Sequence, residues 1–256
     1  MIIHQRALAC MGPAALFILF IPGIAQARTS SPKPPCDSAA SCNQLGTQAF
    51  KRGDIPAAIQ LFKLQVGYAE DAQDAKQSAA AYNNLALAYM RERDYLRASA
   101  WTRLALQADS KSQAAKHNLI GIQKGLAHHR WPTNIGGTYV QYAGRTQWNS
   151  LCVSKLQDKG FHFRLLAYRM GAAWRRYGPA ALGDLKGEAT LTAEDDAQYK
   201  GAADFPTCHI EMKFTPNGVT LEQQGDCGFG HGVRAAGHYE RINTVGNDNC
   251  DEHGLP

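Results

Sequence analysis

The feature that most constrains the fold is an internal repeat in the first half of the chain. A set of small, apolar and turn residues recurs 40 positions further on, at Leu45 and again at Leu85. The first copy reads Leu45-Gly46, Ala49-Phe50, Gly53-Asp54 and Ala58, and the second reads Leu85-Ala86, Tyr89-Met90, Arg93-Asp94 and Ala98. Apolar residues within each copy follow helical spacing on both sides of a short polar break. Repetition of this length is typical of stacked helical hairpins, because each unit buries its apolar face against its neighbours.

The repeats are expected to occupy residues 41–130. Pro56 is the only proline between Ser41 and Gly125, so long helices are not interrupted there. A third apolar stripe predicts a capping helix that covers the open end of the stack; it consists of Ala115, Leu119, Ile122 and Leu126.

The strings Leu-Gly-x-x-Ala-Phe-x-x-Gly-Asp-x-x-x-Ala and Tyr-Asn-Asn-Leu-Ala-x-Ala-Tyr-x-x-x-x-Asp-Tyr-x-x-Ala resemble tetratricopeptide repeats. The longer period and the Asn-Asn-Leu-Ala string are similar to the variant found in kinesin-light-chain-like arrays. The resemblance covers residues 41–128. Two features depart from the pattern, because Gln65 stands at a usually apolar position and no proline closes either repeat.

The resemblance implies a groove that binds a protein or peptide partner, lined by the first helix of each pair. Its amide and basic side chains can hydrogen-bond a peptide backbone or a carboxylate, and Phe50 and Met90 add apolar contact. The residues that the resemblance places in this groove are Asn43, Thr47, Phe50, Lys51, Asn83, Leu87, Met90, Arg91, His117 and Lys124. The alternative is that the repeats only form a packing surface for the second half of the chain.

The second half changes character between His129 and Ile135, where Gly, Thr, Tyr and Phe become frequent and short alternating runs appear. These runs predict antiparallel strands. We expect them at 137–143, 150–156, 161–169, 187–193, 197–202, 207–215, 219–225 and 233–242. Gly137-Thr138-Tyr139 is echoed by Gly237-His238-Tyr239, which indicates that the first and last strands are neighbours in a closed barrel.

The fold class is therefore α+β in two domains, helical hairpin repeats followed by an antiparallel β-barrel. The expected divisions are a signal peptide at 1–27, a linker at 28–40, repeats at 41–130, a barrel at 133–245 and a tail at 246–256.

One hairpin has a predicted register, because Pro216-Asn217-Gly218 marks its turn. With 216–219 as the loop, opposed residue numbers sum to 435. Phe214 then faces Leu221, Lys213 faces Glu222, and Cys208 faces Cys227. Apolar, charged and cysteine partners all match, so this register predicts a Cys208–Cys227 disulfide.

The segment from Gly187 to Tyr239 resembles small periplasmic domains of bacterial proteins associated with lysozyme inhibition. Cys227-Gly228-Phe229-Gly230 followed by Gly237-x-Tyr239 carries the likeness. It implies an alternative function, inhibition of a lysozyme-type cell-wall enzyme through the barrel. The basic charge of the chain opposes electrostatic steering toward a basic lysozyme.

The amino terminus predicts export. Arg6 precedes an apolar run from Ala14 to Ile21, and Ala25-Gln26-Ala27 fits signal-peptidase cleavage. Such cleavage lowers the formal charge from +5 to +4, well short of a nucleic-acid-binding protein. The expected location is periplasmic or secreted, with membrane contact only through the uncleaved signal.

Cleavage also removes Cys10 and leaves six cysteines, which predicts three disulfides in an oxidising compartment. Besides Cys208–Cys227, we expect the local pair Cys36–Cys42, and Cys152–Cys250 tying the tail to the barrel.

The sequence predicts neither catalysis nor a metal or other cofactor. Cys227 beside His231 resembles a thiol and its base, but the expected disulfide removes the thiol. The histidines lack close metal-ligand spacing, and the glycines at 228, 230 and 232 favour a tight turn over a dinucleotide loop.

A basic and aromatic loop is a second candidate surface, for a sugar-containing or anionic polymer. Its residues are Arg169, Trp174, Arg175, Arg176 and Tyr177. Alternatively, Trp174 plugs one end of the barrel and the arginines solvate it. Together these features predict an exported, non-enzymatic protein-binding scaffold, with the repeats binding one partner and the barrel a second ligand.

Overall fold

The computed structural model describes residues 34–246, apart from 128, 130–133, 156–159 and 172–177. The expected signal peptide and the carboxyl-terminal tail beyond 246 lie outside these residues. The described residues from Pro35 onward belong to one compact unit. No helix among them is long and apolar enough to cross a membrane.

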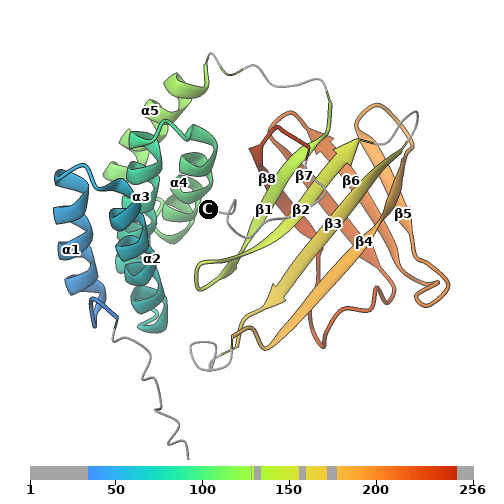
Figure 1. Ribbon diagram of the computed structural model, residues 1–256, viewed down its shortest axis with the longest axis horizontal. Helices are drawn as coiled ribbons and strands as arrows, with labels where there is room; N and C mark the ends of the chain where they lie inside the picture. Colours follow the sequence, from blue (N-terminus) through green and yellow to red (C-terminus); the bar gives the residue numbers. More distant parts are fainter. Residues whose placement is uncertain (1–33, 128, 130–133, 156–159, 172–177, 247–256) are drawn as a thin grey trace, which may run out of the picture. The chain divides into compact units, whose positions relative to one another are not determined.

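Five helices come first, and Figure 1 shows them stacked as antiparallel hairpins. They are α1 (Ala39–Lys51), α2 (Ile55–Asp71), α3 (Ala75–Arg91), α4 (Tyr95–Ala108) and α5 (Gln113–Leu126). The third apolar stripe was correctly predicted, since it lies on α5. Eight strands follow, so the α+β architecture of helices and barrel is confirmed.

Aspartates at intervals of twenty residues begin three of the helices. Asp54, Asp74 and Asp94 are the N-caps of α2, α3 and α4, and each accepts hydrogen bonds from backbone N–H groups of the first turn. The turn residue before each cap has a positive φ, 82° at Gly53, 54° at Gln73 and 63° at Arg93. The chain thus reverses the same way at all three turns.

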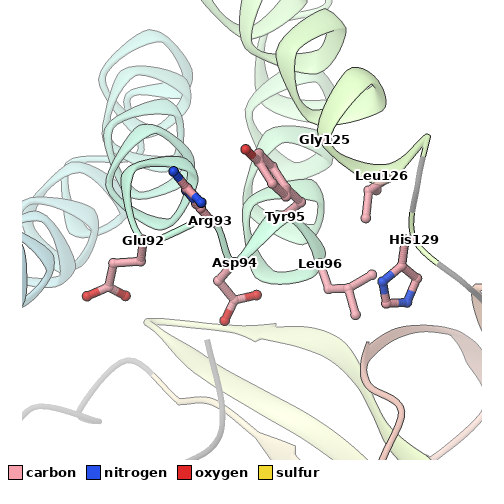
Figure 2. A pocket seen from close by; sticks show the side chains of 8 residues that line it. All are labelled: Glu92, Arg93, Asp94, Tyr95, Leu96, Gly125, Leu126 and His129. Atoms are coloured by element: carbon pink, nitrogen blue, oxygen red, sulfur yellow. The ribbon is translucent and has the colours of Figure 1, made fainter.

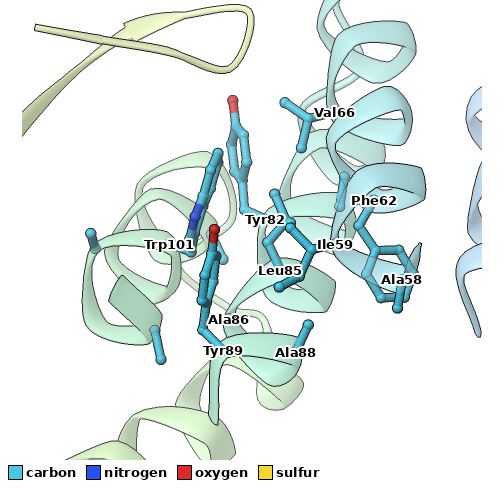
Figure 3. Close-up of a cluster of buried hydrophobic side chains, with 14 of the residues drawn as sticks. Ala58, Ile59, Phe62, Val66, Tyr82, Leu85, Ala86, Ala88, Tyr89 and Trp101 are labelled. Atoms are coloured by element: carbon cyan, nitrogen blue, oxygen red, sulfur yellow. The ribbon is translucent and has the colours of Figure 1, made fainter. Parts of the chain in front are cut away.

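Figure 3 shows the core between these helices, where Trp101 and Leu85 are fully buried among alanines and aromatic rings. Small residues set the helix spacing. A Cβ on Gly46 would lie 2.5 Å from the ring of Phe62, so α1 and α2 could not approach as closely with a larger residue there. Gln65, the departure from the repeat pattern, is buried and accepts a hydrogen bond from Asn84 at 3.0 Å.

The strands form a closed antiparallel barrel in sequence order, in which β1 pairs with β8 as the glycine–aromatic echo predicted (Figure 1). They are β1 (Gly137–Gly144), β2 (Gln147–Lys155), β3 (Gly160–Arg169), β4 (Ala181–Leu191), β5 (Asp196–Lys200), β6 (His209–Thr215), β7 (Gly218–Gln224) and β8 (Gly237–Asn243). Inward side chains such as Tyr139, Phe161 and Ile210 fill the interior.

The predicted register of the β6–β7 hairpin is wrong by two residues. Phe214 faces Val219 and Lys213 faces Thr220, so opposed numbers sum to 433. The loop is a two-residue turn, Pro216-Asn217, closed by Thr215 and Gly218. A shift of two residues keeps every side chain on its own face, so the apolar matching could not distinguish the two registers.

The Cys208–Cys227 disulfide forms nevertheless, with a Cα–Cα distance of 4.7 Å. It lies beyond the end of the ladder, where Gly225 has φ of +70° and its backbone passes close to Thr207. Cys36–Cys42 is also confirmed, at a Cα–Cα distance of 5.1 Å. Cys152 is disulfide-bonded as well, but its predicted partner Cys250 lies outside the described residues.

The helices and the barrel share part of their apolar core. Val140, Trp148 and Ile242 come from strands, yet they are buried in the same cluster as the helical core residues. Trp148 meets Trp101 of α4 edge-on, with ring centroids 5.0 Å apart. Outward-facing residues of β1, β2 and β8 are therefore covered by helices.

The tip of the β1–β2 hairpin is held by one carboxylate at the end of α2. Glu70 accepts hydrogen bonds from the hydroxyls of Tyr82 and Tyr142, both at 2.5 Å, and from the backbone N–H of Arg145 at 2.6 Å. Arg145 and Thr146 have φ of 58° and 61°, as a type I′ turn requires, although neither is glycine. Non-glycine residues pay a steric cost in this conformation, and the contacts to Glu70 compensate it.

Candidate partner-binding face

The helices α1, α3 and α5 have the same charge composition, with basic side chains and no acidic ones, whereas α2 contains acidic residues. Within their bounds, α1, α3 and α5 contain five Lys or Arg residues and no Asp or Glu. Serine or aspartate caps begin all three, at Ser38, Asp74 and Ser112. Any surface that these helices present together is consequently basic.

We call the ten residues that the sequence placed in a groove the odd-helix face, and all ten are exposed or half-buried in the structure. Six are exposed: Asn43, Lys51, Leu87, Arg91, His117 and Lys124. Four are half-buried: Thr47, Phe50, Asn83 and Met90. Phe50 and Met90 pack partly against the helical core, so much of their apolar surface is already used.

Hydrogen bonds between carboxamides link the three helices of this face. Asn84 of α3 donates to the oxygen of Asn43 on α1 at 2.8 Å, and Asn118 of α5 donates to the oxygen of Asn83 on α3 at 2.9 Å. Asn43 and Asn83 lie on helices that these bonds connect, and their side-chain oxygens are already engaged. Their amide N–H groups remain the donors that a ligand can use.

Sequence reasoning missed two components of this surface. Asn118 is buried at 7% exposure and connects α5 to α3, a role that its helical position alone does not reveal. Ile120 of α5 is 54% exposed beside the predicted face residues of that helix. The sequence feature that could have revealed Ile120 is its position directly after Leu119, which places a large apolar side chain outside the apolar stripe.

Four residues of the basic and aromatic loop, Trp174, Arg175, Arg176 and Tyr177, lie outside the described residues. Arg169 is described, and its Nε donates to the carbonyl of His231 at 2.8 Å. The Arg169 side chain also lies against Gly232. Its role in the described part of the chain is to hold the loop after Cys227 to the end of β3.

A hollow of about 510 Å³ lies where the α3–α4 turn meets the end of α5. Figure 2 shows Glu92, Arg93 and Asp94 on the turn, with Tyr95, Leu126 and His129 around it. Tyr95 lies against Gly125, where a Cβ would come within 2.5 Å of its ring. None of the predicted face residues lines this hollow.

Two residues that could have been a thiol nucleophile or a metal ligand, Cys227 and His209, make other contacts. Cys227 has no free thiol, because it is bonded to Cys208. His209 lies 3.4 Å from Glu211 on the same strand, as a surface pair. Among the described residues, no group of three or more His, Cys, Asp and Glu side chains is close enough to hold a metal ion.

Comparisons of the chain with protein-family models, with curated proteins and with solved structures find no match.

Proposed function

We propose that this chain is an exported scaffold whose odd-helix face binds an acidic segment of a partner protein. The observation that carries the proposal is the charge of three adjacent helices, which hold five cationic side chains and no carboxylate within their bounds. Electrostatic complementarity of this kind raises association rates and selects partners of opposite charge. The exposed Leu87 and Ile120 add apolar contact.

The tetratricopeptide resemblance supports the same proposal. Helical hairpins with repeated caps and close small-residue contacts occupy the matching residues. In that family, the first helix of each pair lines the ligand groove, and the odd-helix face comes from those helices. The contacts of β1, β2 and β8 with the helical core involve other residues, so the face is not consumed by packing against the barrel.

Charge reversal tests the proposed face. The double variant Lys51→Glu/Arg91→Glu should capture at least tenfold less partner from envelope extract than the unmodified chain. Both side chains are exposed, so folding should be unaffected. The matched control is Lys200→Glu/Arg234→Glu, which makes the same charge change at exposed barrel positions. Equal capture by both double variants would contradict the proposed face.

Export is a separate component of the proposal. The disulfides Cys36–Cys42 and Cys208–Cys227 fit an oxidising compartment. Amino-terminal sequencing of the protein from the periplasm or medium should find Arg28 as the first residue. Recovery of the chain only in the reducing cytoplasm, with Met1 retained, would contradict export.

A second candidate function is inhibition of a lysozyme-type enzyme by the barrel. It is favoured by two exposed apolar side chains, Leu182 at 54% and Phe205 at 40%, near the loop that follows Cys227. Both side chains lie beside the loop that follows Cys227, where they offer apolar contact to a bound enzyme. The intact chain should inhibit lysis of cell walls by lysozyme, and Phe205→Ser should weaken inhibition. Absence of inhibition at a large molar excess of the chain would exclude this candidate.

A further inference from the structure

A crevice separates part of α4 from the barrel, and neither the repeats nor the barrel forms it alone. It has a volume of about 410 Å³, within the range of sites for small molecules. Its walls come from α4, β1, β2 and β8. The residues that matter for recognition are Arg103, Gln107, Gln141, Trp148, His238 and Glu240.

The charged groups of this crevice balance one another. Arg103 of α4 lies 3.4 Å from the carboxylate of Glu240 on β8, so one cation and one anion face the same space. Burial raises the pKa of Glu240, while Arg103 opposes that shift. Burial, and then Arg103, lowers the pKa of His238, which favours the neutral imidazole. A crevice with this balance does not attract a ligand of high net charge.

The remaining polar groups are planar donors and acceptors. Gln107 is exposed at the rim, and Gln141 is held from behind by a hydrogen bond from Asn149 at 2.9 Å. Trp148 is 3% exposed, and its indole N–H is buried with no hydrogen-bond partner among the described residues. This nitrogen is fully buried, so the Trp148 indole contributes apolar surface to the crevice wall and not a hydrogen-bond donor.

We propose that this crevice binds a neutral saccharide of one or two rings. A sugar hydroxyl both donates and accepts, so adjacent hydroxyls can accept from the Arg103 guanidinium and donate to the Glu240 carboxylate at the same time. The exposed Gln107 carboxamide offers the same double capacity, whereas the Gln141 carboxamide already accepts from Asn149 and donates to the carbonyl of Ala236. Anions satisfy Arg103 only, and they face repulsion from Glu240.

The site is distinct from the odd-helix face, which holds none of these residues. It also does not depend on the interior of the barrel, which is filled by apolar side chains. Binding here would stabilise the contact between the repeats and the barrel, because the ligand touches α4 and three strands at once.

Titration calorimetry of the disulfide-intact full chain tests the proposal. The saccharide probes are glucose, N-acetylglucosamine and their β-1,4-linked or α-1,4-linked disaccharides; glycine and sodium sulfate represent a zwitterion and an anion. We expect saturable binding of at least one saccharide, and no saturable binding of glycine or sulfate. Tryptophan fluorescence should change with the same dissociation constant, since Trp148 lines the site.

Two variants assign the binding to the crevice. Glu240→Gln should weaken saccharide binding at least tenfold. If it does not fold, Gln107→Trp provides the same test from an exposed position, because the larger ring fills the rim without disturbing buried residues. The matched control is Glu222→Gln, an exposed carboxylate on β7 that should bind as the unmodified chain does. Binding of glycine or sulfate in preference to every saccharide would overturn the proposal. So would no saturable saccharide binding, or full saccharide affinity in Gln107→Trp.

Discussion

Replacement of Glu70 by alanine should destabilise the whole chain more than any exposed charge substitution does. Glu70→Ala removes the acceptor of three hydrogen bonds, from Tyr82 and Tyr142 at 2.5 Å each and from the N–H of Arg145 at 2.6 Å. Each buried donor left without an acceptor costs about 1–3 kcal/mol. Three such donors place the loss in the free energy of unfolding at about 3–9 kcal/mol, and water entering the truncated site would move it toward the lower value.

The loss of stability should be largest at the β1–β2 hairpin. Without Glu70, the turn at Arg145 and Thr146, which both have positive φ, loses the acceptor of the Arg145 N–H and keeps the Arg145–Asp71 ion pair and the hydrogen bond from Thr146 to the Tyr142 hydroxyl. Glu70→Gln keeps one carboxamide oxygen as an acceptor, so we expect an intermediate loss of about 1–2 kcal/mol. The ranking of the two variants is as informative as the size of either loss.

Urea denaturation followed by tryptophan fluorescence is the appropriate assay. Trp101 and Trp148 lie in the cluster beside Tyr142, so their emission reports on the hairpin directly. Glu92→Ala is the control. Glu92 is an exposed carboxylate at the C-cap of α3, and its replacement should change the free energy of unfolding by less than about 0.5 kcal/mol. A Glu70→Ala loss no larger than that of Glu92→Ala would refute the reasoning.

Three further outcomes are expected. Replacing Cys208 and Cys227 by alanine opens a loop with a sequence separation of 19 and should cost about 3 kcal/mol, measured by denaturation without reductant; an unchanged midpoint would contradict this. The pKa values of Tyr82 and Tyr142 are raised above 10 by burial, so the folded state keeps protons that the unfolded state releases. Stability is therefore complete below about pH 10 and falls as the pH rises above it, and denaturation at a series of alkaline pH values should show that slope. Asp94→Ala removes an N-cap and should cost about 1 kcal/mol, whereas Asp94→Asn should retain most of the stability; equal losses would argue against capping.

The local structure followed from the sequence because it depends on neighbours in the chain. Apolar residues at helical spacing, such as Leu85 and Tyr89, identify helices whatever they pack against. Alternation identified eight strands in their correct order, and the echo at Gly137 and Gly237 identified the pair that closes the barrel. Two disulfide pairings also followed, since cysteines brought together by a short loop or one hairpin have few alternatives.

Only the tertiary structure decided the register of the β6–β7 hairpin. Side chains alternate with a period of two, so registers that differ by two residues give the same inward and outward faces. Phe214 finds an apolar partner in either Val219 or Leu221. Turn geometry selected the tighter loop, and the positive φ of Gly225 then allowed the cysteines to meet.

The contact between the helices and the barrel could not be predicted from the sequence either. Outward residues of a barrel strand are expected to face solvent, and the sequence cannot state which of them a second layer covers. Val140 and Trp148 are outward residues that helices bury, and Glu70 is a polar residue near a helix end that became a hydrogen-bonding centre. Sequence patterns determined each element, because helical and strand periodicity are local properties. The crevice, the shared core and the Glu70 contacts join residues far apart in the chain, and only their packing in three dimensions created them.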